Sequence, residues 1–271
     1  MNKSRLAVML FALLTLINCN GAVTIQAPEM TAVIMDVAGV TVFWERNSEI
    51  ESGSEFVGYN IYAHTDSSAL LISDGEDLNK FNGQVVTDTM YQVNGLSQDS
   101  VYYIQVRTVN IEDKVDGYNS ATPFLKASPR PEFVVTMYLR FDYQGTIDSC
   151  AIRYRDALII ADSLMADSAA DMWIRASGDT VWLESPTNHP LYGSGVRQTM
   201  FSNIGPADFD TISGVTAEPD MEESEVAVGE MLIAKTEDGN YVKIYVEAID
   251  TVNGTIALLY AYQNVVEFPY F

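Results

Sequence analysis

Alternating apolar and polar positions fill much of the chain and predict short β-strands. Residues 40–44, 57–62 and 101–109 each alternate and are rich in β-branched and aromatic side chains. A period of two of this kind is typical of half-buried antiparallel strands. Asn-Gly, Asp-Gly and Ser-Gly pairs separate these segments and indicate tight turns. Several short strands over about 100 residues predict a β-sandwich for residues 26–131.

Four side chains in this segment stand in motifs of a known fold. Trp44 ends a Val-x-Trp pair on the second predicted strand, and Tyr59 follows a glycine on the third. Leu96 and Tyr102 match a Leu-x-Pro-x-Thr-x-Tyr pattern, with glutamine in place of the proline. By these motifs residues 26–131 resemble a fibronectin type III domain. The resemblance implies that all four side chains lie in the core and that the Tyr102 hydroxyl bonds to backbone a few residues upstream.

The rest of the chain, residues 132–271, is also predicted to be mostly β. A Ser-Pro-Arg-Pro sequence at residues 128–131 precedes it, and its two prolines favour an extended, semi-rigid linker. Residues 172–174 and 181–183 predict two short aromatic strands, and residues 231–262 predict consecutive hairpins. The motifs identify no family for this domain. The predicted fold class is therefore all-β: a fibronectin type III-like, immunoglobulin-like β-sandwich followed by a second mostly β domain.

Two stretches of the second domain have weaker patterns. Apolar side chains in residues 155–166 are roughly spaced for one short helix, and whether this helix forms stays open. Residues 184–229 are rich in proline, glycine and acid, and they predict long loops with one strand near residues 199–204.

The N-terminal residues have the pattern of an export signal. Lys3 and Arg5 precede an apolar run over residues 6–17. A run of about 10–14 apolar residues is too short to span a bilayer and is typical of a signal peptide.

The residues at the end of this apolar run bear on whether the exported chain would be anchored to the membrane or secreted. Leu-Ile-Asn-Cys, ending at Cys19, resembles the lipobox of bacterial lipoproteins, so that residues 1–19 would form a lipoprotein signal ending at lipidated Cys19. Asn18 departs from the small residue usual there, and cleavage after Ala22 with secretion stays the alternative. The resemblance implies an extracytoplasmic, membrane-anchored protein, and Asn20 favours the outer membrane.

Charge and residue counts exclude several function classes. The 271 residues include 37 Asp+Glu and 15 Lys+Arg, a net charge of −22, which argues against nucleic-acid partners and anionic lipid surfaces. Two His and two Cys cannot build a zinc, haem or iron–sulfur site from several of either type, so no cofactor is expected. Cys150 is interpreted as a small core residue, and a Cys19–Cys150 disulfide is open only if Cys19 carries no lipid.

The sequence contains little that indicates catalysis or metal binding. The acidic run at residues 218–225 lacks the spacing of a calcium loop and is interpreted as solvated, so no metal is predicted. Gly193-Ser194-Gly195 lacks the nucleophile-elbow motif, and nothing brings His64 and His189 together. The protein is therefore predicted not to be an enzyme.

Exposed aromatic side chains would suit ligand recognition. Trp173, Trp182, Tyr192 and the tail at residues 268–271 are candidates to bind a sugar or peptide, while both tryptophans could instead be core residues. The predicted function is a lipid-anchored, non-catalytic binding, adhesion or assembly module with a protein or glycan ligand. The membrane would be contacted only through the N-terminal lipid. An accessory or weak carbohydrate-active hydrolase and an oligomerising surface component remain alternatives.

Overall fold

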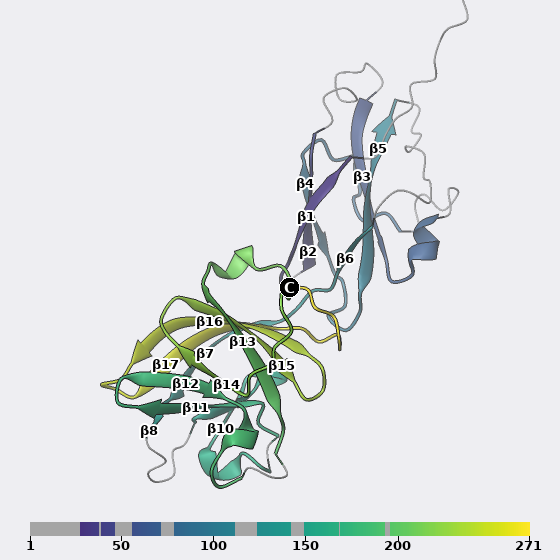
Figure 1. Cartoon of the computed structure of the whole chain (residues 1–271). Helices are drawn as coiled ribbons and strands as arrows, with labels where there is room; N and C mark the ends of the chain where they lie inside the picture. The colour runs from purple at the N-terminus through teal and green to yellow at the C-terminus, as the bar shows by residue number, and fades with distance from the viewer. Residues whose placement is uncertain are drawn as a thin grey trace, which may run out of the picture.

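A computed structural model describes residues 28–37, 39–46, 56–71, 79–111, 124–141, 149–167, 169–192 and 196–271. The predicted signal, Cys19 and the Gly-Ser-Gly sequence lie outside the described residues. The chain is all-β, as predicted, and forms two stacked domains with its C-terminus between them (Figure 1). None of the described helices has the length and apolarity needed to cross a membrane.

The first domain consists of two three-stranded antiparallel sheets. The first sheet has the order β1-β2-β4: β1 (Met30–Met35), β2 (Gly39–Trp44) and β4 (Met90–Asn94). The second has the order β3-β5-β6: β3 (Phe56–His64), β5 (Tyr102–Asn110) and β6 (Leu125–Ala127). One short 3-10 helix, η1 (Ser67–Leu71), follows β3. The predicted strands thus lie where alternation indicated.

The four motif side chains of this domain do lie in or against its core. Trp44 and Tyr59 are buried, with their rings edge to face at 5.4 Å. Leu96 and Tyr102 are partly buried against the same cluster. The backbone N–H of Ser97 donates to the Tyr102 hydroxyl at 3.0 Å, which ties the corner before β5 to the strand itself. Aromatic burial and this local bond together fix how the two sheets meet.

The second domain packs a five-stranded sheet on a six-stranded one (Figure 1). The five-stranded sheet has the order β13-β15-β16-β17-β7: β13 (Thr199–Pro206), β15 (Glu230–Thr236), β16 (Tyr241–Asp250), β17 (Thr255–Tyr262) and β7 (Glu132–Tyr138). The other sheet has the order β10-β9-β11-β12-β14: β10 (Leu158–Ile160), β9 (Ala151–Arg153), β11 (Met172–Ser177), β12 (Thr180–Glu184) and β14 (Glu223–Val226). Strand β8 (Arg140–Phe141) pairs with β11 in parallel.

The hairpins of this domain confirm the sequence pattern, and two other expectations are corrected. β11 pairs with β12, β15 with β16 and β16 with β17, as predicted. The helix left open for residues 155–166 does not form, because Ala157, at φ 53°, ends a one-turn 3-10 helix and lets β10 fold back on β9. Residues 184–229 hold not only β13 but also β14, which occupies part of the acidic run.

Segments from both ends of the second domain hold the two domains together. The linker at residues 127–131 is largely buried, and the Arg130 N–H donates to the Asp36 carbonyl at 3.2 Å. After β17 the chain returns to the first domain, where Val265 and Phe268 pack against its core. These contacts fix the first domain at two points, so the space between the domains has defined walls.

Candidate ligand groove between the domains

A groove runs along the open side of the first domain, where its two sheets end. Strand β1 is the edge of one sheet and β6 the edge of the other, and neither has a second partner strand among the described residues. The two edges lie beside each other. Between them and the second domain is a pocket of about 430 Å³, a size typical of ligand sites. Its lining residues are Thr31, Val33, Met35, Phe124, Leu125, Lys126, Ser213 and Tyr270.

The second domain closes one end of this groove with a small two-stranded contact. Gly214 and Tyr270 form an isolated antiparallel bridge, and the Phe271 N–H donates to the Ser213 carbonyl at 2.9 Å. A side chain at Gly214 would approach the Pro269 carbonyl oxygen to 3.1 Å, so glycine allows this close pairing. Tyr270 is thereby held at the groove with 45% of its surface exposed.

A second, smaller pocket adjoins the first and shares two of its residues. Its volume is about 210 Å³, and Val33 and Ser213 line both pockets. The cations Arg130 and Lys243 line it together with the exposed carboxylate of Asp210. The other lining residues are Ile34, Thr211, Ile212 and Phe271. With Lys126, the two pockets bring three of the 15 basic residues of a strongly acidic chain into one groove.

Lys243 is the third residue of β16 and is only 1% exposed. Its ammonium donates to the carbonyls of Phe209 and Ile212 at 2.8 and 3.0 Å, and it lies 4.2 Å from the Phe209 ring centroid. No carboxylate lies within ion-pair distance of it in the described part of the chain. Burial, with a smaller contribution from nearby Arg130, lowers the pKa of Lys243 to about 7.

Arg130 is 2% exposed and only partly satisfied. One terminal nitrogen pairs with the Glu132 carboxylate, while its Nε has no hydrogen-bond partner within the residues that the structure describes. Burial lowers the pKa of Arg130, and Glu132 opposes that effect. A guanidinium stays protonated in proteins, so Arg130 is a permanent buried charge beside Lys243.

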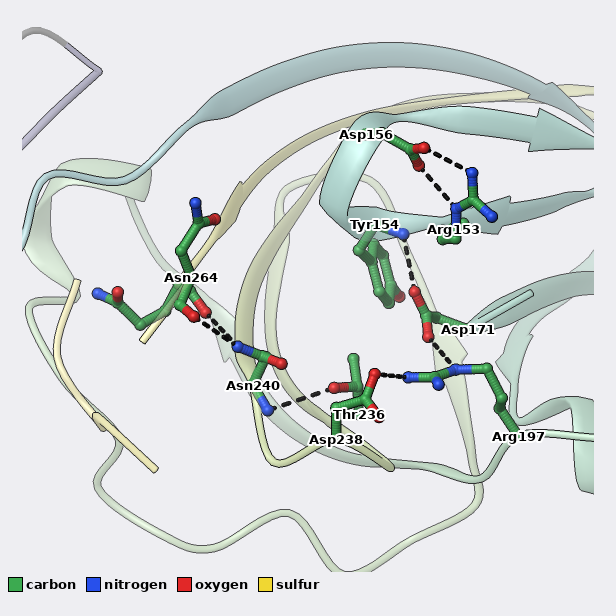
Figure 2. Close-up of polar contacts among 10 residues, drawn as sticks. Arg153, Tyr154, Asp156, Asp171, Arg197, Thr236, Asp238, Asn240 and Asn264 are labelled. Atoms are coloured by element: carbon green, nitrogen blue, oxygen red, sulfur yellow. Dashed lines mark hydrogen bonds and ion pairs between the residues drawn. The ribbon is translucent and has the colours of Figure 1, made fainter. Parts of the chain in front are cut away.

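A different charged cluster joins the two sheets of the second domain (Figure 2). Arg197 bonds Asp171 at 2.8 Å and Asp238 at 2.5 Å, and Asp171 accepts the Tyr154 N–H at 2.9 Å. Burial raises the pKa of Asp171. Because the Arg197 guanidinium occupies both carboxylates, this arrangement serves as a structural bridge rather than as an acid–base pair.

The same view shows Asn240, in the turn that also holds Asp238, beside the segment around Asn264 (Figure 2). The Asn240 amide donates to the carbonyls of Gln263 and Asn264, each at 3.0 Å. Asn264 in turn donates to Asp99 of the first domain at 3.0 Å. The turn between β15 and β16 therefore holds the segment that returns to the first domain.

A third buried cluster lies at the far side of the six-stranded sheet. The Asp162 carboxylate lies 2.8 Å from His189 Nε2 and 3.2 Å from an Arg140 nitrogen. His189 Nδ1 accepts the Leu191 N–H at 3.2 Å, and burial lowers the pKa of this histidine, so a neutral ring protonated at Nε2 fits both contacts. All three charged or polar side chains are at most 1% exposed.

The aromatic residues singled out in the sequence do not gather in one surface. Trp173 is fully buried and its indole N–H donates to the Ser185 carbonyl at 3.1 Å, so it is a core residue. The Arg175 guanidinium covers Trp182, 3.8 Å from its ring centroid. Tyr192 stacks on buried His189 at 4.8 Å. In the tail, Phe268 and Phe271 are buried too; Tyr270 lines the larger pocket and Phe271 the smaller one.

The polar residues singled out in the sequence also lie apart from one another in the structure. His64 ends β3 in the first domain and His189 lies in the second, so they do not form one site. Cys150 is fully buried, and burial raises its pKa to about 12. No group of three or more His, Cys, Asp or Glu suited to a metal ion occurs among the described residues. In the acidic run, Glu218 binds Lys235 and the Tyr241 hydroxyl.

The groove residues were not found from the sequence. Lys243 alternates with Val242 and Ile244, which predicts an outward-facing lysine on a half-buried strand. It is buried because the segment around Phe209 and the tail cover that face of the sheet. Arg130 could have been noticed as a charge between two prolines in a linker. No known protein-family model matches this chain, and a search among curated proteins gives no significant match.

Proposed function

We propose that this protein is a non-catalytic binding module that takes an extended segment of a partner protein into the groove between β1 and β6. The observation that carries the proposal is the 430 Å³ pocket between two sheet edges that lack second partners in the described chain. An extended peptide can add to such an edge by main-chain hydrogen bonds, while neighbouring pockets take its side chains.

The lining of the groove suits this mode of binding. Val33 and Met35 provide apolar contacts on β1, and Leu125 provides them on β6. Thr31 and Lys126 are exposed and polar, so the rim can bind polar groups of a ligand. Fixed domain contacts on both sides of the groove reduce the entropy cost of forming the site.

We further propose that the first domain is a fibronectin type III-like module. Its β1-β2-β4 and β3-β5-β6 strand orders support this, as do the buried Trp44–Tyr59 pair and the bond from Ser97 to Tyr102. The fold alone assigns no ligand. It does explain why the binding edge consists of the first and last strands of the domain.

Peptide selection tests the groove directly. A random peptide library is selected on a soluble form comprising residues 20–271, and binding of each selected peptide is measured by fluorescence polarisation. Val33→Arg and the exposed Thr31→Arg should each weaken binding by about tenfold or more, because an added side chain blocks the edge strand. Peptide binding should also slow hydrogen exchange of the β1 amides.

Val134→Arg is the matched control, since Val134 is 69% exposed on β7, an edge strand of the second domain. Circular dichroism and thermal unfolding verify that each variant is folded. Equal binding of the selected peptides to wild type and to both groove variants would disprove the proposed site. So would a library that yields no binder.

We also propose that the module is anchored outside the cytoplasm by a lipid on Cys19, on the basis of the lipobox-like sequence. Metabolic labelling with a fatty-acid probe should tag the wild-type protein and fail to tag Cys19→Ser. Cys150→Ser is the control and should label normally, because Cys150 is buried in the second domain. Equal labelling of wild type and Cys19→Ser would exclude lipidation at this residue.

A further inference from the structure

We infer that the 210 Å³ pocket beside the groove is an anion subsite, in which Arg130 and Lys243 bind a carboxylate of the partner segment. This inference rests on the proposed peptide-binding function and assigns a chemical class to one part of the ligand. Arg130 and Lys243 bring two buried basic groups to one pocket, and a buried charge without a partner is costly.

The first step is the state of the two cations. Lys243 has two carbonyl acceptors but no ion-pair partner among the described residues. Arg130 is paired on one nitrogen by Glu132, and its Nε donor remains unused within the described chain. Both side chains are at least nine-tenths buried, so water cannot freely replace the missing partner.

The second step is the balance of charge around the pocket. The charged groups that act on Lys243 are Arg130, Glu132 and Asp210. Glu132 is already bonded to Arg130, and Asp210 is exposed to solvent and lies beyond ion-pair distance of Lys243. A bound carboxylate would supply the counter-charge at the point where the protein provides none, and charge-assisted bonds of this type are strong.

The third step is the position of the pocket relative to the groove. Val33 and Ser213 line both cavities, so one ligand can reach from the edge of β1 to the cations. A strand added along β1 would therefore place an acidic side chain, or a terminal carboxylate, near Arg130.

Acetate is the probe for the subsite, and acetamide is its neutral control. The Lys243 side-chain resonance is followed by ¹H–¹³C NMR in the residue 20–271 form and assigned by its loss in Lys243→Met. Acetate should shift this resonance with saturation and raise its titration midpoint, because a bound anion favours the protonated amine. Acetamide should produce no saturable shift.

Variants identify the groups that hold the anion. Arg130→Gln should weaken acetate binding by about tenfold or more, since one charged donor is removed. Arg130→Lys, which keeps a charge, serves if the glutamine variant does not fold and should bind acetate more weakly than wild type because it lacks the forked donor. Lys235→Met is the matched control and should leave acetate binding unchanged, since Lys235 is bonded to Glu218 and Glu267 elsewhere.

The outcomes separate this inference from the proposed function. If acetate does not shift Lys243, or if acetamide does so equally, the subsite is disproved. If selected peptides bind but acetate does not compete and Lys243→Met binds them equally, the groove function stands and the subsite fails. If acetate binds but no peptide does, the subsite stands and the peptide-binding function fails.

Discussion

Two buried charged clusters, one within the second domain and one at the boundary between the domains, differ in whether their charges are balanced. In one, the buried Asp162 carboxylate lies 3.2 Å from an Arg140 nitrogen and 2.8 Å from a neutral His189, so the buried cation has a buried counter-ion. In the other, Arg130 and Lys243 share a pocket, and Lys243 has no counter-ion among the described residues. A balanced cluster holds a fold together, whereas an unbalanced one at a pocket provides free energy for ligand binding.

The positions of the two clusters in the molecule agree with this difference in charge balance. His189 and Asp162 are covered by Trp173 and Tyr192 on the far side of the six-stranded sheet. Arg130 and Lys243 line an opening between the domains. Both clusters are buried, so the features that set apart the cluster proposed to bind a ligand are the missing counter-ion of Lys243 among the described residues and its position at a pocket.

The largest expected effect comes from breaking the balanced cluster. Asp162→Asn keeps the shape of the side chain but removes the negative charge that lies 3.2 Å from a nitrogen of the buried Arg140. We expect the free energy of unfolding to fall by about 3–5 kcal/mol. Urea denaturation followed by tryptophan fluorescence measures this loss.

Asp167→Asn is the control, because Asp167 is an exposed carboxylate nearby in the sequence. Cys150 gives a second measurement, since burial raises its thiol pKa to about 12 and it is the only cysteine in residues 20–271. Its labelling by a thiol reagent should accelerate by at least about tenfold in Asp162→Asn. A loss below about 1 kcal/mol would refute the structural role of the cluster.

The next effect concerns the pH dependence produced by Lys243. Its pKa is lowered from 10.5 to about 7 in the folded chain, so above pH 7 the unfolded chain binds more protons and stability should rise with pH. Between about pH 7.5 and pH 9 the gain should be about 2 kcal/mol. Lys243→Met should remove this slope, as measured by urea denaturation across that range.

Lys235→Met serves as the comparison, because the pKa of Lys235 is raised, mainly by the bond to Glu218. It should keep the rising slope of the wild type. A Lys243→Met variant whose stability still rises with pH as in wild type would show that Lys243 is charged in the folded protein throughout this range.

The smallest effect comes from His189, in the opposite pH range. Burial lowers its pKa below 6.5, so the unfolded chain takes up a proton first and stability should be lost as pH falls below about 6.5. His189→Gln should reduce this loss by on the order of 1 kcal/mol by about pH 5. Thermal unfolding at several pH values measures it, with His64→Gln as the control, and an unchanged acid slope in His189→Gln would contradict the neutral state of the ring.

Much of the fold could be predicted from the sequence because local pattern determined it. The alternation around Trp44 and Tyr59, and the turns of the later hairpins, specify strands without reference to distant contacts. Strand β14 was not predicted, because its Glu-Ser-Glu sequence has few apolar side chains and gains its position only by pairing with β12. The structure of residues 155–166 could not be decided from the sequence either. The apolar spacing there is compatible with a helix, but the chain makes a tight turn at Ala157 instead.

The candidate site could not be predicted, because it exists only between the domains. Nothing local distinguishes Lys243 from any outward-facing lysine of a β-strand, and its burial depends on a segment more than 30 residues away in the chain. Arg130 lies in a linker, where sequence pattern predicts exposure. Charge imbalance at such positions becomes visible only when all neighbours are known.

The return of the chain to the first domain has a consequence for biosynthesis. Val265 and Phe268 pack against a core whose other members all precede residue 128. A growing polypeptide exposes its N-terminal segments well before these two side chains leave the ribosome. The first domain would therefore lack part of its interior until residues 265–268 have been made, well over 100 residues after its last strand.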